Sequence, residues 1–332
     1  MKKIFIRSPY FIEIDESGQT SAKIEIFLWN KGTTEPTTPT YTLSKNIPSA
    51  TQTKIAWNVA NYAKEFIKPI APVSVSVPTE ENVNTWCYMR VVSYSDDVEV
   101  NDETFVCLNG FTSYSDGYNY STEDDVVLLA NEDIKLTHNK YINVWIDEDL
   151  SADYSWETAS STQDFSATES SLYKLPLNYS NINILKKLAT TYFNINAEYL
   201  CEPKYTPITC TFINRYGGWQ FLTFFKANSS TIDVTSKDFD MLPSSINYNV
   251  LQGQKKVFNS QGKQKIKCNT GWVDENYFEL IQDLLLSETV LLDNKPAIVK
   301  SQSSEYKTHL QNKNINYEIE FEYNYGLIND VI

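Results

Sequence analysis

Histidine is nearly absent from this sequence of 332 residues, since it occurs only at His138 and His309. Neither histidine lies in an HExxH pair or beside clustered ligands of the kind that zinc enzymes use. No GxSxG nucleophile turn accompanies them, so we interpret both as turn or surface residues. The ten glycines form neither a GxxxxGK[ST] loop nor a GxGxxG loop, which leaves nucleotide chemistry without a motif. These absences predict a protein that is not an enzyme and needs no cofactor.

Cysteine is also scarce and shows no pairing pattern. The five residues are Cys87, Cys107, Cys201, Cys210 and Cys268. The number is odd and no CxxC spacing occurs, whereas a disulfide framework is normally even and dense. We predict reduced and mostly buried thiols.

An acidic stretch, DEDLSAD from Asp147 to Asp153, has the alternating oxygen ligands of a calcium loop. An EF-hand requires glycine at its sixth position and glutamate at its twelfth, but Ala152 and Thr158 stand there. The EF-hand reading therefore fails, and a calcium site of another kind among the loops stays open.

Long hydrophobic runs and excess basic charge are missing as well. No window approaches the roughly 20 apolar residues of a membrane span, and the apolar run before Arg7 is too short for a secretory signal. The net charge of −14 argues against sequence-specific nucleic-acid binding, which needs lysine and arginine against phosphates. DNA that passes close to an acidic wall would be repelled rather than held, so a DNA conduit remains compatible with this charge.

What the sequence does contain is aromatic and β-branched. Its 22 tyrosines and 16 phenylalanines favour a mainly β protein. We predict a β-sandwich-like domain over residues 1–150, an acidic Ser/Thr-rich linker or loop over 151–175, and a β-rich α+β assembly domain with few short helices over 176–332. Strands are predicted over 3–8, 22–29, 73–78, 85–94, 103–111, 124–131 and 140–147. The segment 181–200 fits either a helix or strands.

Two short helices are expected from their apolar spacing. The first follows Asn58 as its N-cap and stops before Pro69, and the second follows Asp274 as its N-cap. Turns are expected at Asp116-Gly117 and around Asp293.

A hairpin is predicted at Tyr216-Gly217-Gly218 between two apolar segments. The second of these segments has apolar residues on both of its faces, so it belongs either to a two-sided core or to a subunit interface. Candidate interface residues on this hairpin are Tyr216, Trp219, Phe221 and Phe225.

The last predicted strand, INYEIEFEYNYG, alternates apolar residues with glutamates. Glu318 and Glu320 would lie about 6.6 Å apart at roughly 3.3 Å per residue, near the carboxylate separation of about 6.5–9.5 Å in inverting glycosidases. Strict alternation instead indicates a wet or salt-bridged face, because a catalytic acid needs a buried or crowded site. We therefore assign Glu318, Glu320 and Glu322 to a face that meets water or a neighbouring protomer.

Several segments together resemble a known family. They are CEPKYTP (201–207), TFINRYGGWQFLTF (211–224), NTGWVDENYFELIQDLLLSETVLL (269–292), FIRSPYFIEI (5–14), KIEIFLW (23–29) and NVANYAKEFI (58–67). They resemble structural tail or neck proteins of tailed bacteriophages of gut Bacteroidetes, including the crAss-like group, over roughly half of the chain. The resemblance implies a virion component that assembles as a cyclic ring beside other tail or neck proteins in the host cytoplasm.

The expected function is therefore that of a connector, hub or other ring around the genome-delivery channel. The alternative is a carbohydrate-binding or receptor-binding module of the tail, in which Trp145, Trp156 and Trp219 would stack on sugars. A tail-associated glycosidase is the third reading.

Overall fold

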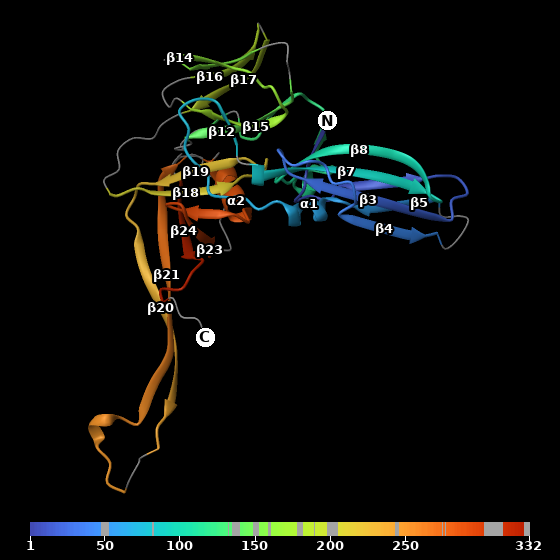
Figure 1. Ribbon diagram of the computed structural model, residues 1–332. Helices are drawn as coiled ribbons and strands as arrows, with labels where there is room; N and C mark the ends of the chain where they lie inside the picture. Colours follow the sequence, from blue (N-terminus) through green and yellow to red (C-terminus); the bar gives the residue numbers. More distant parts are fainter. Residues whose placement is uncertain are drawn as a thin grey trace. The chain divides into compact units, whose positions relative to one another are not determined.

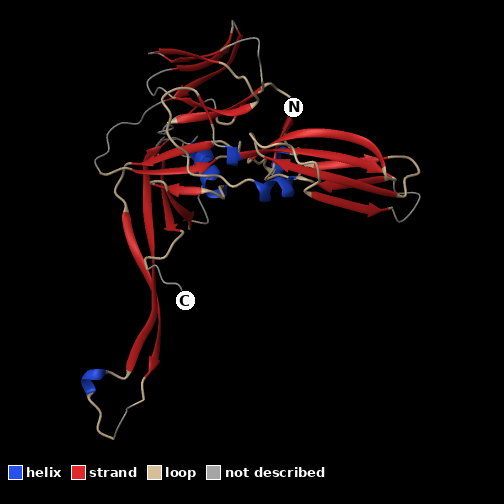
Figure 2. Ribbon diagram, in the orientation of Figure 1, coloured by secondary structure: helices blue, strands red, loops and turns tan. Residues whose placement is uncertain are grey.

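The computed structural model describes residues 1–47, 53–81, 83–131, 133–134, 140–148, 153–158, 161–177, 182–188, 190–197, 205–242, 246–273, 275, 277–301 and 315–328. The chain is mainly β, as predicted, and most of the elements in Figure 2 are strands. It forms two compact units. Unit 1 comprises Met1–Leu200 and Phe212–Leu222, and unit 2 comprises Cys201–Thr211 and Thr223–Ile332. These units divide the chain at other positions than the boundaries expected at 150 and 175.

Unit 1 begins with a sandwich of two sheets. The larger sheet has the order β4-β3-β7-β8-β1-β9, and β2 pairs with β5 in the smaller one. The bounds are β1 (Lys2–Phe5), β2 (Phe11–Asp15), β3 (Ser21–Trp29), β4 (Tyr41–Asn46), β5 (Lys54–Asn58), β7 (Trp86–Ser95), β8 (Val98–Leu108) and β9 (Ser121–Thr122). Alternate residues of β2, β3 and β5 are buried, so the period-2 pattern of the sequence builds this core.

One short helix, α1 (Ala60–Phe66), contributes to the same core through Ala60 and Ala63. Its N-cap is Val59, so the prediction of Asn58 as N-cap is wrong by one residue. The Asn58 side chain still contacts the first helical residue: its Oδ1 accepts from the Ala60 N–H at 3.3 Å and also from the Tyr10 N–H at 3.1 Å.

Two further sheets of unit 1 enclose a second core. Their orders are β10-β12-β15-β6 and β11-β17-β16-β13-β14. The bounds are β6 (Thr79–Glu80), β10 (Val126–Leu128), β11 (Asp133–Ile134), β12 (Tyr141–Ile146), β13 (Tyr154–Thr158), β14 (Ser161–Phe165), β15 (Ser171–Pro176), β16 (Ile182–Lys187) and β17 (Thr190–Ala197); the short 3₁₀ helices η1 (Val83–Thr85) and η2 (Tyr114–Asp116) also belong to unit 1.

These sheets differ from the sequence-based expectations in two places. The stretch 151–175, expected to be a linker or loop, contains β13, β14 and most of β15. Its many Ser, Thr and acidic residues include the outward positions of strands whose inward positions, such as Tyr154 and Trp156, are buried. The open segment 181–200 contains the two strands β16 and β17.

The seven-stranded sheet has the order β19-β18-β22-β23-β24-β21-β20. Unit 2 contains β20 to β24 and the first part of β18, whereas residues 212–213 of β18 and 219–222 of β19 belong to unit 1. The bounds are β18 (Ile208–Ile213), β19 (Trp219–Phe224), β20 (Ser229–Asp240), β21 (Lys255–Val273), β22 (Val290–Leu292), β23 (Lys295–Val299) and β24 (Ile315–Tyr323), with the helix α2 (Tyr277–Leu286) and the 3₁₀ helix η3 (Val250–Gln252). Helix α2 confirms the second predicted helix, while its expected N-cap, Asp274, lies outside the described residues. The turn at Asp293-Asn294 is confirmed, and both residues have the positive φ that such a two-residue hairpin requires.

The predicted hairpin at Tyr216-Gly217-Gly218 is also confirmed, and its turn is held inside unit 1. The amide nitrogen of the Asn214 side chain donates to the Leu129 carbonyl at 3.0 Å, and the Trp219 N–H donates to Asn143 Oδ1 at 2.8 Å. A Cβ at Gly218 would collide with the Leu129 carbonyl oxygen. Glycine is therefore required here by close backbone packing and not by the turn alone.

Among the helices that the structure describes, none is long and apolar enough to cross a membrane.

Candidate assembly interface

Strands β20 and β21 of unit 2 continue past β24 as a two-stranded ribbon, which we call the arm (described residues 232–242 and 246–264). β20 pairs with β21 from Ser229↔Lys267 to Asp240↔Lys255, but β24 pairs with β21 only from Lys265 onward. In Figure 1 the two orange strands run on together well beyond β23 and β24. All twelve residues of β20 are exposed. Because an isolated two-stranded ribbon is marginally stable in water at best, the arm is the part of unit 2 most in need of a partner.

The end of the arm, which we call the tip (described residues 239–242 and 246–258), is apolar although it is exposed. Its most exposed side chains are Leu242 (93%), Ile246 (98%), Val250 (81%) and Leu251 (93%). The tip still has local order: the Met241 N–H donates to the Gln254 carbonyl at 2.7 Å, and the Asn249 side chain caps η3 by accepting from the Leu251 N–H at 2.9 Å. Apolar groups gathered on an ordered, exposed element are typical of a protein–protein contact.

The base of the arm carries a ladder of ion pairs on one face of the sheet. The register places Lys265 opposite Glu322 and Lys267 opposite Glu320. Lys267 Nζ lies 2.5 Å from Glu318 Oε2. Lys265 Nζ lies 2.5 Å from an Asp233 carboxylate oxygen and 3.8 Å from Glu320 Oε1. The glutamates of the last strand are thus matched by lysines of β21, which agrees with a salt-bridged face.

Glu322 departs from the simple expectation of a wet face, because only 5% of it is exposed. Its Oε1 lies 3.2 Å from both Lys263 Nζ and Lys300 Nζ. Burial alone would raise the pKa of this carboxyl, but the two lysine hydrogen bonds outweigh burial and hold its pKa below the ordinary value. The pKa of Glu318 is lowered by its hydrogen bond with Lys267. Both groups stay ionised at neutral pH, which suits cross-strand pairing and not general acid catalysis.

The opposite face of the same strands is buried. Ile266 stands opposite Phe321 and Cys268 opposite Ile319, and all four are at most 8% exposed. The prediction that the apolar residues of 315–323 face a core is therefore confirmed. Strands β21 and β24 therefore have one charged and one apolar face, and both faces continue onto β20.

The candidate interface residues on the hairpin lie elsewhere than expected. Trp219 is 2% and Phe221 is 4% exposed, and the Phe221 ring packs edge-on against Tyr141 at 5.0 Å. The Tyr216 hydroxyl bonds Asn131 at 2.9 Å, and Phe225 is half-buried. The assignment of Trp219 and Phe221 to an assembly surface is corrected here, because every residue of β19 is buried within the protomer. Of the two readings that the sequence left open, the two-sided core is the right one.

The sequence reasoning also missed the arm itself. The signal was present in TIDVTSKDFD (231–240), where apolar and polar residues alternate, and in the lysine-rich KQKIK (263–267) that complements the final glutamates. Such a pattern predicts a strand, but it does not say that the strand lies outside any core.

The proposed sugar-stacking tryptophans are buried, which corrects the reading of them as exposed platforms. Trp145 and Trp156 are 0% exposed, and their indole N–H groups donate to Asp147 Oδ1 at 2.7 Å and to the Pro176 carbonyl at 2.8 Å. With Trp219 also buried, none of the three indole faces is available to a glycan.

The residues considered for catalysis or metal binding lie mostly outside the described part of the chain. Both histidines, Cys201 and most of the acidic stretch 147–153 lie outside the described residues. Where residues are described, no three His, Cys, Asp or Glu side chains come together to hold a metal. The four described cysteines are free and buried, as predicted, and burial raises the pKa of the Cys107, Cys210 and Cys268 thiols.

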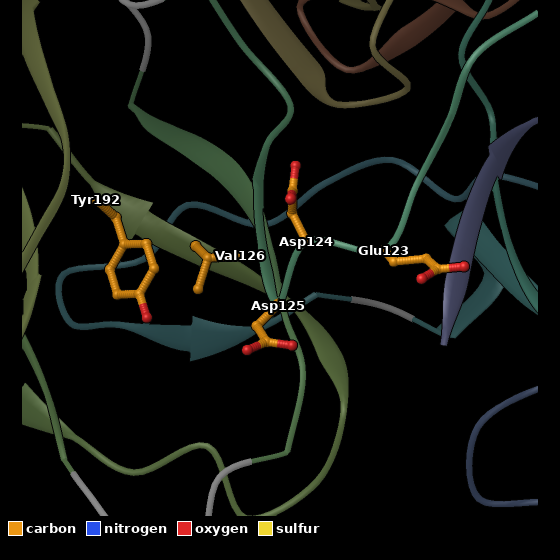
Figure 3. Close-up of a pocket in the computed structure, with 5 residues that line it drawn as sticks. All are labelled: Glu123, Asp124, Asp125, Val126 and Tyr192. Carbon is orange, nitrogen blue, oxygen red and sulfur yellow. The ribbon is translucent and has the colours of Figure 1, made fainter.

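One cavity of about 420 Å³ in unit 1 is lined by Glu123, Asp124, Asp125, Val126 and Tyr192. Figure 3 shows that the three carboxylates come from consecutive residues and point away from one another. Ligands of a single cation must converge on one point, so this arrangement is that of a solvated acidic turn.

No family model, no curated protein and no solved structure matches the chain.

Proposed function

We propose that this chain is a structural protein whose copies assemble through the arm, and that the assembly is a ring in the tail or neck of a bacteriophage virion. The observation that carries the proposal is the exposed, apolar and locally ordered tip of a two-stranded arm. Such an arm gains stability only when it is covered, and a second copy is the partner always present at assembly.

The geometry of such a contact favours a ring. The arm belongs to unit 2, and we infer that it contacts a different surface on the next copy. A contact between two different surfaces repeats from copy to copy, and it closes into a ring when the rotation per copy divides a full turn. The virion setting rests on the resemblance of the sequence to phage tail and neck proteins.

The charge of the chain suits a ring around a genome channel. With a formal net charge of −14 per copy, a ring would repel DNA that passes through it and would not hold it. Connector, hub and other ring layers all fit this proposal equally.

The proposal is tested by native mass spectrometry and negative-stain imaging of the purified chain, and by locating the chain in purified particles. We expect closed rings of one size, at a position in the tail or neck. A chain that remains monomeric at every accessible concentration and is missing from purified particles would overturn the proposal.

A further inference from the structure

The segment 73–77, with the sequence VSVSV, has an ideal strand pattern and yet belongs to none of the sheets formed by the described residues. The sequence predicts a strand over 73–78, because valine and serine alternate at every position. In the structure no backbone–backbone hydrogen bond joins this segment to another described residue. Two of its carbonyls accept from side chains instead: the Ser76 carbonyl accepts from Gln163 Nε2 at 3.4 Å, and the Val77 carbonyl accepts from Thr79 Oγ1 at 2.8 Å. The structure therefore corrects that prediction, for a reason outside the segment: the described chain offers it no partner strand.

The exposure of the segment and its flanking prolines favour pairing with a strand of another copy. Val73 is 72% and Val77 is 53% exposed, and Val75 between them is half-buried, so much of the apolar side of the segment lies in water. Pro72 and Pro78 bracket the five residues, and proline favours extended backbone in the residue before it. The segment is thus apolar on one side and limited to five residues by its flanking prolines. Ser76 and Val77 form a bend in the protomer and would have to straighten on pairing.

The outer edge of β20 is a suitable acceptor for an added strand. β20 is the last strand of its sheet among the described residues, and all twelve of its residues are exposed. Ile232 and Val234 remain 57% and 67% exposed. They lie on the face that also holds the buried Ile266, while Asp233 lies on the charged face, bonded to Lys265.

The two patterns match face by face. A strand laid along β20 with its valines beside Ile232 and Val234 would extend the apolar face, and its serines would meet the face that carries Asp233. The segment 69–78 contains no charged residue, so it brings no like charge against the arm. An exposed edge strand is a ready template for such an addition.

We propose that the segment 73–77 of one copy adds as a strand to the outer edge of β20 in a neighbouring copy. The inference rests on the proposed self-assembly and names the surfaces that meet. The donor lies in unit 1 and the acceptor in unit 2. Every copy therefore carries one free donor and one free acceptor, as a ring of identical contacts requires.

The first test uses proline, which removes a backbone donor and is excluded from a paired strand. Only alternate residues of a strand point their N–H groups toward a given neighbour, so Ser74→Pro and Val75→Pro together cover both edges of the segment. Their matched controls, Ser74→Ala and Val75→Ala, keep the N–H. Because the segment makes no backbone pairing in the protomer, the proline variants should keep the melting temperature of the unassembled chain.

We expect at least one proline variant to need about tenfold or more protein for half-assembly than its alanine control, as measured by sedimentation velocity. If both proline variants assemble as their controls do, the strand addition is wrong.

The second test identifies the partner strand. A Val75→Cys chain is mixed with chains carrying cysteine at position 230, 232 or 234 in place of Ser230, Ile232 or Val234, and the mixture is oxidised. Because the two cysteines are on separate chains, any mixed disulfide joins two copies, and it requires their Cα atoms to come within about 7 Å. Val98→Cys, at a valine that is 66% exposed in unit 1, replaces Val75→Cys as the control.

We expect one of the three β20 positions to give a mixed dimer with Val75→Cys and none to do so with Val98→Cys. Yields at the control level for all three positions would overturn the proposed pairing. If the chain does not assemble at all, the proposed function fails and this inference fails with it. If assembly is lost on changing the tip but is indifferent to proline and cysteine in the segment 73–77, the inference alone fails.

Discussion

The tip of the arm offers the most direct perturbation of assembly, the double substitution Leu242→Asp and Leu251→Asp. Both leucines are 93% exposed in the protomer, so the free chain loses almost no packing. Fully burying a leucine stabilises by about 1.5–3 kcal/mol. Two leucines buried in one contact therefore contribute about 3–6 kcal/mol, which corresponds to a factor of roughly 10² to 10⁴ in the dissociation constant.

Mass photometry over a concentration series would measure this factor, with circular dichroism and the melting temperature as checks of the fold. Surface substitutions away from special features usually change stability by less than about 0.5 kcal/mol, so the fold should be retained. Leu188→Asp is the matched control, because Leu188 is a leucine of unit 1 with 83% exposure. Assembly of the double variant at the same concentration as Leu188→Asp would refute the role of the tip.

Three other predictions concern stability. Gly218→Ala should lower the free energy of unfolding by about 3 kcal/mol in urea titrations, because the added Cβ collides with a backbone carbonyl. The control is Gly32→Ala, whose Cβ meets no atom within 4 Å although φ is +80°. It should lower the free energy of unfolding by only about 1 kcal/mol. Glu81→Ala should cost about 3 kcal/mol, because it leaves the Lys174 ammonium buried without the carboxylate 3.4 Å away; an unchanged urea midpoint would contradict this. The lowered pKa of Glu322 predicts a stabilisation that is complete above about pH 4.3, the ordinary pKa of glutamate, and is lost as the pH falls from there through the lower folded value; Glu322→Gln should flatten that part of the pH–melting curve.

Local patterns predicted those parts of the fold in which one chain segment decides its own structure. The alternation in 315–323 identified both the strand and its buried face. The Gly217-Gly218 turn was readable because a tight hairpin with close packing leaves little choice of residue. The core of the first sandwich follows from period-2 burial in the same way.

Structure that depends on neighbouring strands could not be predicted from the local sequence pattern. The sequence VSVSV indicates a strand, but pairing requires a second strand that the described chain does not supply. Conversely, the Ser/Thr-rich stretch 151–175 has weak apolar periodicity, yet neighbouring strands bury Tyr154 and Trp156 and order it. The alternative function placed three tryptophans on the surface. They are buried, as an indole in an apolar strand usually is.

Cryo-electron microscopy of the assembled, purified chain tests the central claim most directly, since it locates the tip in the assembly. The account predicts a closed ring in which the tip of each copy is covered by the neighbouring copy. A ring whose tips all project into solvent, or particles that contain single copies only, would contradict it.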